Sequence, residues 1–94
     1  MISTSINLPT IADVQRFVEK ISPLPGNFDL QADGYVLDAK SLMGILSLDL
    51  TKPIRLTIQY DTPETLRAIR PFLDPGQTEI TTMHLTEIIA WPND

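Results

Sequence analysis

The spacing of the apolar residues changes several times along this chain, and these changes restrict the folds that it can adopt. A period of two, which is typical of half-buried strands, occurs in the segments 2–6, 28–32 and 54–60. A period near 3.6, which is typical of amphipathic helices, occurs from Ile11 to Ile21 and from Pro63 to Leu73. Between these segments we predict a tight turn at 33–34, a strand at 35–38 and a short apolar helix from 42. The resulting order of strands and helices predicts an α+β fold. In that fold a four-stranded antiparallel sheet has helices on one face.

Polar residues precede each predicted helix and mark where it begins. Thr10 can accept a hydrogen bond from an unpaired backbone N–H, and Asp13, three residues later, suits the positive end of the helix dipole. Thr62 precedes a proline at the first helical position, and Ser41 precedes the short apolar helix. We therefore interpret Thr10, Ser41 and Thr62 as helix N-caps.

The stretch from residue 42 to residue 48 is too apolar to be buried along a single helical stripe. We expect some of its side chains to lie on a second, exposed face, where they could bind a protein partner. The candidates are Leu42, Met43 and Leu46, and packing in the core is the alternative for each. Met43 is the best suited to a surface that adapts to more than one partner.

Composition excludes several classes of function. The 94 residues suit one small domain, and a chain with no cysteine and one histidine cannot form a disulfide framework or a multi-histidine metal site. A net charge of −5 with scattered basic residues argues against nucleic-acid binding. No apolar run could span a bilayer and no signal peptide is evident, so we expect a cytoplasmic protein. The acids show no spacing for acid–base work and no glycine-rich phosphate loop is present, so no enzyme activity, metal or cofactor is predicted.

The last part of the chain, residues 77–94, has apolar side chains that argue against a merely solvated tail. Its threonines allow a strand, whereas Leu85, Ile88 and Ile89 with Thr82 as a cap favour a helix. We expect this extension to pack on its own domain or on a second copy, as in a homodimer. His84 lies here and is interpreted as an ordinary polar residue.

The segment from Lys40 to Leu48 resembles the HPr family, the phosphocarrier proteins of the bacterial sugar phosphotransferase system. The spacing from Arg16 through Gly34 to Ser41 also fits that family without gaps, and the resemblance covers residues 1–76. It implies an HPr-like open-faced sandwich. It also implies that Ser41 matches the serine that a dedicated kinase phosphorylates in Gram-positive bacteria, with Lys40, Leu42, Met43 and Leu46 in the region that docks partners.

The sequence departs from the HPr family where the family accepts phosphate. A histidine, then an arginine two residues on, then a proline stand there in the family, whereas this chain has Thr10, Ala12 and Asp13. A threonine hydroxyl would form a stable ester, and the aspartate would oppose a phosphate. We therefore predict that relay chemistry is lost and that the protein is a regulatory or binding module acting through the Ser41 helix. Its expected partners are an HPr-type serine kinase or a transcriptional regulator; the alternatives are a carrier with an unconventional acceptor and a structural interaction domain.

Overall fold

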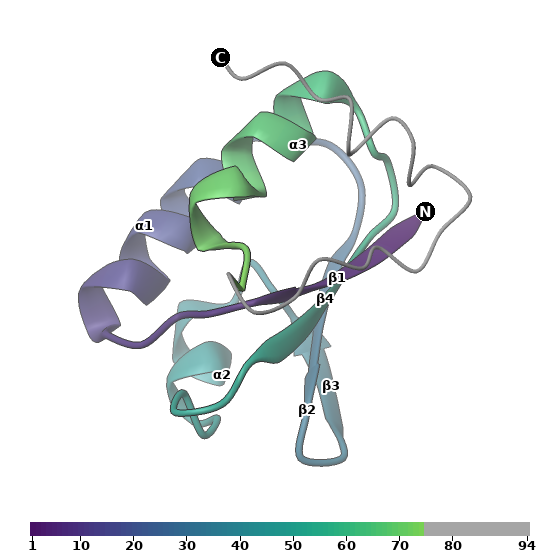
Figure 1. The fold of residues 1–94 in the computed structure, drawn as a ribbon. Coiled ribbons are helices and arrows are strands. Elements are labelled where there is room, and N and C mark those ends of the chain that lie inside the picture. The colour runs from purple at the N-terminus through teal and green to yellow at the C-terminus, as the bar shows by residue number, and fades with distance from the viewer. Residues whose placement is uncertain (75–94) are drawn as a thin grey trace.

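The computed structural model describes residues 1–74 of the chain, and these form a sheet of four strands with helices on one of its faces (Figure 1). In chain order the elements are β1 (Ile2–Ile6), α1 (Ile11–Ile21), β2 (Phe28–Ala32), β3 (Tyr35–Asp38), α2 (Leu42–Leu46), β4 (Ile54–Ile58), α3 (Pro63–Ile69) and a 3₁₀ turn, η1 (Arg70–Phe72). This confirms the predicted α+β class and the predicted order. The expected helix in 77–94 and the boundary after residue 76 lie outside the described residues.

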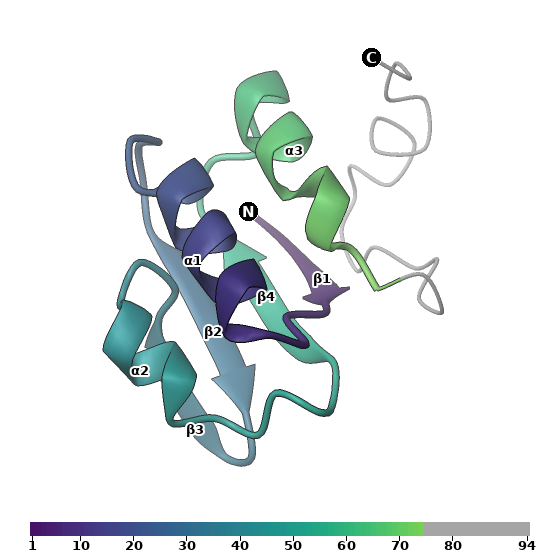
Figure 2. The same cartoon turned by 90° about the vertical axis from the view of Figure 1, so that its left-hand side faces the viewer.

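The sheet is antiparallel throughout, in the order β1-β4-β2-β3. Its central strand pairs place Leu30 opposite Leu56 and Phe28 opposite Ile58, so their apolar side chains share one face. The three helices all lie on that face, in front of the strands in Figure 2. The other face has no helix among residues 1–74, and polar side chains such as Asp29 and Arg55 are exposed there.

The core lies between the sheet and the helices. Buried side chains alternate along β1, β2 and β4, and α1 contributes Val14, Phe17 and Ile21. The rings of Phe17 and Phe72 meet edge to face with their centroids 5.3 Å apart, which joins α1 to η1. Ile11 differs from the expected stripe because it is the first residue of α1 and is 60% exposed.

The end of β1 lies beside the segment that follows α3. The backbone N–H of Asn7 donates to the carbonyl of Phe72 at 2.8 Å, and the N–H of Asp74 donates to the carbonyl of Ser5 at 3.0 Å. These bonds surround a bridge between Ile6 and Leu73. The helical period extends to Leu73 in sequence, but α3 ends at Ile69 and Pro71 belongs to η1, because proline cannot donate a backbone hydrogen bond within an α-helix.

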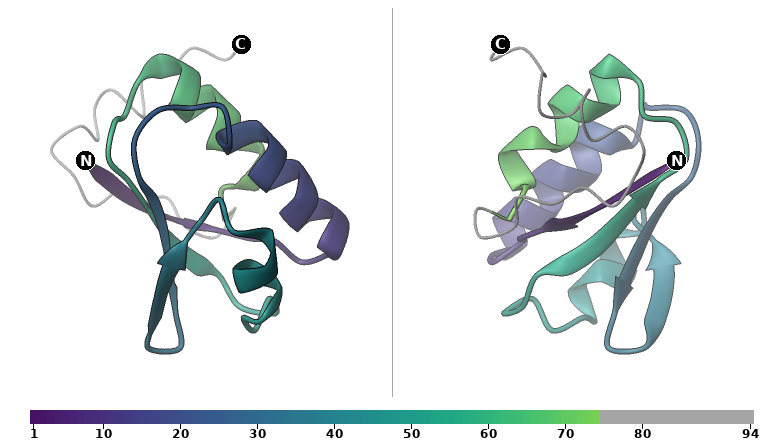
Figure 3. Two further views of the ribbon diagram at one scale, coloured as in Figure 1. Left: turned by 180° about the vertical axis from the view of Figure 1, so that it is seen from behind. Right: turned by 45° about the vertical axis from the view of Figure 1, so that its right-hand side comes forward.

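The hairpin of β2 and β3 turns at Asp33 and Gly34, whose φ angles are +53° and +82°. Two consecutive left-handed residues are what a two-residue hairpin turn of this hand requires, and the Asp-Gly pair predicts it. The hairpin projects beyond α2 at one end of the molecule (Figure 3). No helix in residues 1–74 is both long and apolar enough to cross a membrane.

Candidate functional site: the surface around α2

Ser41 has the N-cap geometry that its sequence context predicts. Its φ and ψ angles of −95° and 98° are extended, and its hydroxyl oxygen accepts a hydrogen bond from the backbone N–H of Gly44 at 3.3 Å. Gly44 permits this close approach, because a Cβ there would lie 3.1 Å from the Ser41 hydroxyl oxygen. The Ser41 side chain is exposed. A kinase could therefore reach the hydroxyl without unfolding the domain.

The three apolar candidates on α2 divide between core and surface. Met43 is 76% exposed, whereas Leu42 and Leu46 are half-buried and pack against the core around the fully buried Ile45. The expectation that this helix displays apolar surface is thus met mainly by Met43. A helix of five residues has about one and a half turns, so only its innermost side can be fully buried.

Lys40, the fourth candidate, directs its charge away from the helix start. Its ammonium donates to the carbonyl of Leu24 at 2.6 Å and lies 5.2 Å from the centroid of the Phe28 ring. These contacts tie the end of β3 to the loop after α1. Lys40 is adjacent to Ser41 in sequence, but its side chain serves another part of the molecule.

The strand before α2 adds exposed apolar surface that the sequence reasoning did not identify. Tyr35 and Val36 are 68% and 64% exposed. A hollow of about 360 Å³ lies between β3 and the residues that follow α2, lined by Tyr35, Val36, Leu37, Ser47 and Leu48. The sequence signal was the run Tyr35-Val36-Leu37, which has apolar residues on both faces of a strand and so cannot bury all of them in one core.

Thr10 is the N-cap of α1. Its hydroxyl oxygen accepts from the backbone N–H of Asp13 at 3.1 Å, and the Asp13 carboxylate accepts from the Thr10 backbone N–H at 3.2 Å. The Thr10 hydroxyl also donates to that carboxylate at 2.7 Å. This is a reciprocal capping box. The Asp13 carboxylate in addition forms an ion pair with Arg16, so both groups already have partners.

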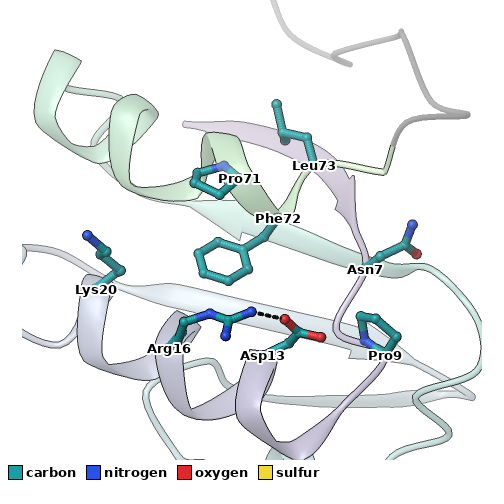
Figure 4. A pocket seen from close by; sticks show the side chains of 8 residues that line it. All are labelled: Asn7, Pro9, Asp13, Arg16, Lys20, Pro71, Phe72 and Leu73. Carbon is teal, nitrogen blue, oxygen red and sulfur yellow. Dashed lines mark hydrogen bonds and ion pairs between the residues drawn. The ribbon is translucent and has the colours of Figure 1, made fainter. Parts of the chain in front are cut away.

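A second hollow, of about 560 Å³, lies between α1 and η1 (Figure 4). Phe72 and Pro71 form its apolar side, and Arg16 and Lys20 project from α1 on the opposite side. Arg16 is bound to Asp13, which also lines the hollow. The Asp13 carboxylate offsets the charge of Arg16 and opposes an anionic ligand at that side chain, which leaves a single lysine, Lys20, as the other basic residue of the lining within residues 1–74. We therefore do not assign this hollow to phosphate.

The acidic residues of the described chain do not assemble a metal centre. Within residues 1–74 no group of three or more His, Asp or Glu side chains could hold a metal ion. The Asp49 carboxylate accepts two hydrogen bonds from Thr51. The Thr51 hydroxyl and backbone N–H donate these bonds, at 2.5 and 3.0 Å, and lower the pKa of Asp49 below the ordinary value. These bonds belong to a local turn between α2 and β4.

We compared the chain with known protein families and with curated proteins. No protein-family model matches the chain, and no curated protein matches it in sequence.

Proposed function

We propose that this chain is an HPr-like protein-binding module that acts in the cytoplasm through the surface around α2, without phosphate-relay chemistry. The observation that carries the proposal is the pairing of an exposed serine hydroxyl at the N-cap of α2 with the 76% exposed Met43 two residues later. A flexible thioether on an otherwise well-packed domain is typical of surfaces that accept more than one partner.

Loss of the relay is supported by the side chains at the start of α1. Phosphate transfer needs a nucleophile that forms a high-energy bond and a cation to stabilise the transferred group. Thr10 is engaged in a capping box, and its neighbour Asp13 places a carboxylate where a phosphate would have to sit. The native chain should therefore acquire no acid-labile phosphate from phosphoenolpyruvate and the general transferase.

Phosphorylation of Ser41 would be the regulatory step. The Ser41 hydroxyl oxygen attacks the γ-phosphorus of ATP, the bond from that phosphorus to the bridging oxygen of ADP breaks, and the hydroxyl proton passes to a base of the kinase. The product adds about two negative charges beside Met43. This change would weaken a partner that buries the methionine in an apolar pocket and favour one that offers arginine or lysine beside such a pocket.

The test is incubation of the protein with an HPr-type serine kinase and ATP, followed by mass spectrometry of the intact chain. We expect one acid-stable phosphoryl group on the native protein and none on Ser41→Ala. The matched control is Ser47→Ala, which removes an exposed hydroxyl at the other end of α2 and should leave phosphorylation unchanged. An unmodified native chain, or an acid-labile phosphate gained from the general transferase, would contradict the proposed function.

A further inference from the structure

The outer edge of β3 has no strand beside it among residues 1–74. β3 is the last strand in the sheet order and pairs with β2 on one side only. Figure 1 shows the hairpin of β2 and β3 at the margin of the sheet, away from α1 and α3. Sheet edges of this kind present backbone donors and acceptors to any extended chain that approaches them.

The register identifies which backbone groups point outward. The N–H of Ala39 donates to the carbonyl of Phe28 at 2.7 Å, so alternation along an antiparallel ladder directs the groups of Leu37 and Tyr35 toward β2 as well. The N–H and carbonyl of Val36 and the N–H of Asp38 then point outward. The Asp38 carbonyl is already bonded to the N–H of Ser41 at 3.0 Å, which ends the available edge there.

The side chains on the two faces of this edge differ in chemistry. Tyr35 and Leu37 lie on the helix side and line the hollow of about 360 Å³ that Leu48 closes. On the open side Asp38 lies directly opposite Asp29 across the hairpin, and both are exposed. Two like charges in a cross-strand pair repel each other. A cation beside them would relieve that repulsion.

We propose that the outer edge of β3 binds an extended basic peptide as a fifth strand of the sheet. Alternate apolar side chains of the peptide enter the hollow beside Leu37 and Leu48, and alternate lysines or arginines lie on the open face beside Asp38 and Asp29. Pairing of this edge with the same edge of a second copy is disfavoured by charge repulsion. Each chain has a net charge of −5, and the two Asp29–Asp38 pairs would lie in one joined sheet.

This inference rests on the proposed function and deepens it, because it names the class of partner that the α2 surface receives. The hollow is continuous with α2 through Ser47 and Leu48, which follow the helix directly. A partner that adds a strand to β3 therefore reaches the end of the helix that begins at Ser41.

The probe is a blocked, fluorescently labelled heptapeptide in which lysine alternates with valine and isoleucine, and binding is followed by anisotropy and by amide NMR of the whole chain. Its control has the same composition with the four lysines placed together. We expect the alternating peptide to bind more tightly, and to shift and protect the Val36 amide. N-methylation of one alternate set of peptide amides should abolish binding, and methylation of the other set should leave it intact, because only one set faces β3.

Two variants test the edge itself. Val36→Pro removes one outward N–H and should weaken binding about fivefold, whereas Val36→Thr keeps it and should bind as the native chain does. Asp38→Asn keeps the oxygen that accepts from the Lys40 backbone N–H and should weaken binding about two- to fivefold. This second variant needs no change in backbone, so it is informative even if the proline variant fails to fold.

Equal sensitivity to both methylation patterns, or amide shifts confined to the hollow between α1 and η1, would overturn the β3 assignment. The result is separable from the proposed function, because kinase modification of Ser41 does not use the β3 edge. A Ser41 that resists the kinase while the peptide still binds with alternating methylation sensitivity would refute the regulatory step and retain the strand-addition site. A Ser41 that the kinase phosphorylates, in a chain that does not bind the alternating peptide, would retain the regulatory step and refute the strand-addition site.

Discussion

The capping box at the start of α1 leads to a quantitative prediction about the stability of the domain. Thr10→Ala removes the acceptor of the Asp13 N–H and the donor to the Asp13 carboxylate. Loss of an N-cap of this kind reduces the free energy of unfolding by about 1 kcal/mol. In a domain of this size that corresponds to a fall of about 4–8 °C in melting temperature. Thr10→Ser retains both hydrogen bonds and should melt close to the native chain.

The two members of the box should be energetically coupled. Asp13→Ala removes the carboxylate that accepts from the Thr10 N–H and hydroxyl, and also its exposed pair with Arg16, for a loss of about 1 kcal/mol. Because the hydrogen bond from the Thr10 hydroxyl to the Asp13 carboxylate is lost in either single variant, the double variant should lose less than the sum, by about 0.5 kcal/mol or more. Urea denaturation of the four proteins measures this.

Two results would refute the capping argument. One is a Thr10→Ala protein as stable as the native chain, and the other is strict additivity in the double variant. The outcome also governs the fairest test of relay chemistry, the triple change Thr10→His, Ala12→Arg and Asp13→Pro. That variant loses the whole box, so its folding must be verified by circular dichroism before a negative transfer result has meaning.

Three further predictions concern other parts of the fold. Gly34→Ala should lower the free energy of unfolding by about 1–2 kcal/mol through its positive φ alone, because nothing lies within 4 Å of the added Cβ. Gly26→Ala should lower it further, because its φ is also positive and a ring carbon of Tyr60 lies 2.5 Å from the added Cβ. Urea denaturation measures both. Phe72→Ala removes a ring packed edge to face in the core and should lose about 3–5 kcal/mol in the same assay. Thr51→Ala should raise the pKa of Asp49 toward its ordinary value of 3.8, measured by NMR titration of the carboxyl carbon. Because the folded-state pKa of Asp49 is lowered, the stabilising effect of Thr51 should be present at neutral pH and lost as the pH falls through the acidic range; equal stability loss at every pH would contradict this.

The elements of the fold were predictable because local signals and apolar period agreed at each of them. Alternation along 54–58 specified a strand with one buried face, and the Asp33-Gly34 pair specified both the turn and the register of its hairpin. Tyr60 continued the alternation in sequence but lies beyond β4 and is 49% exposed. A period of two therefore located the strand without fixing its end.

The candidate site was only partly predictable, for a physical reason. The sequence indicated an N-cap at Ser41 because that depends on neighbouring residues alone. It did not show that Leu42 is half-buried while Met43 is exposed, because the rotation of a helix of five residues is fixed by what packs against it. The hollow beside β3 was equally hidden, since it joins Tyr35 to Leu48 across the fold.

The contacts of the Lys40 side chain differ from those that its position next to Ser41 in the sequence indicates. By its place in the sequence, a lysine directly before Ser41 is suited to bind a phosphate on that serine. Its ammonium, however, is bonded to the Leu24 carbonyl and stacked over Phe28, so turning toward Ser41 would break a hydrogen bond and a cation–π contact. A phosphate on Ser41 would either draw Lys40 away and loosen the loop after α1, or stay unpaired within the domain. In the second case its charge is presented to the partner, which must then supply the neutralising cation.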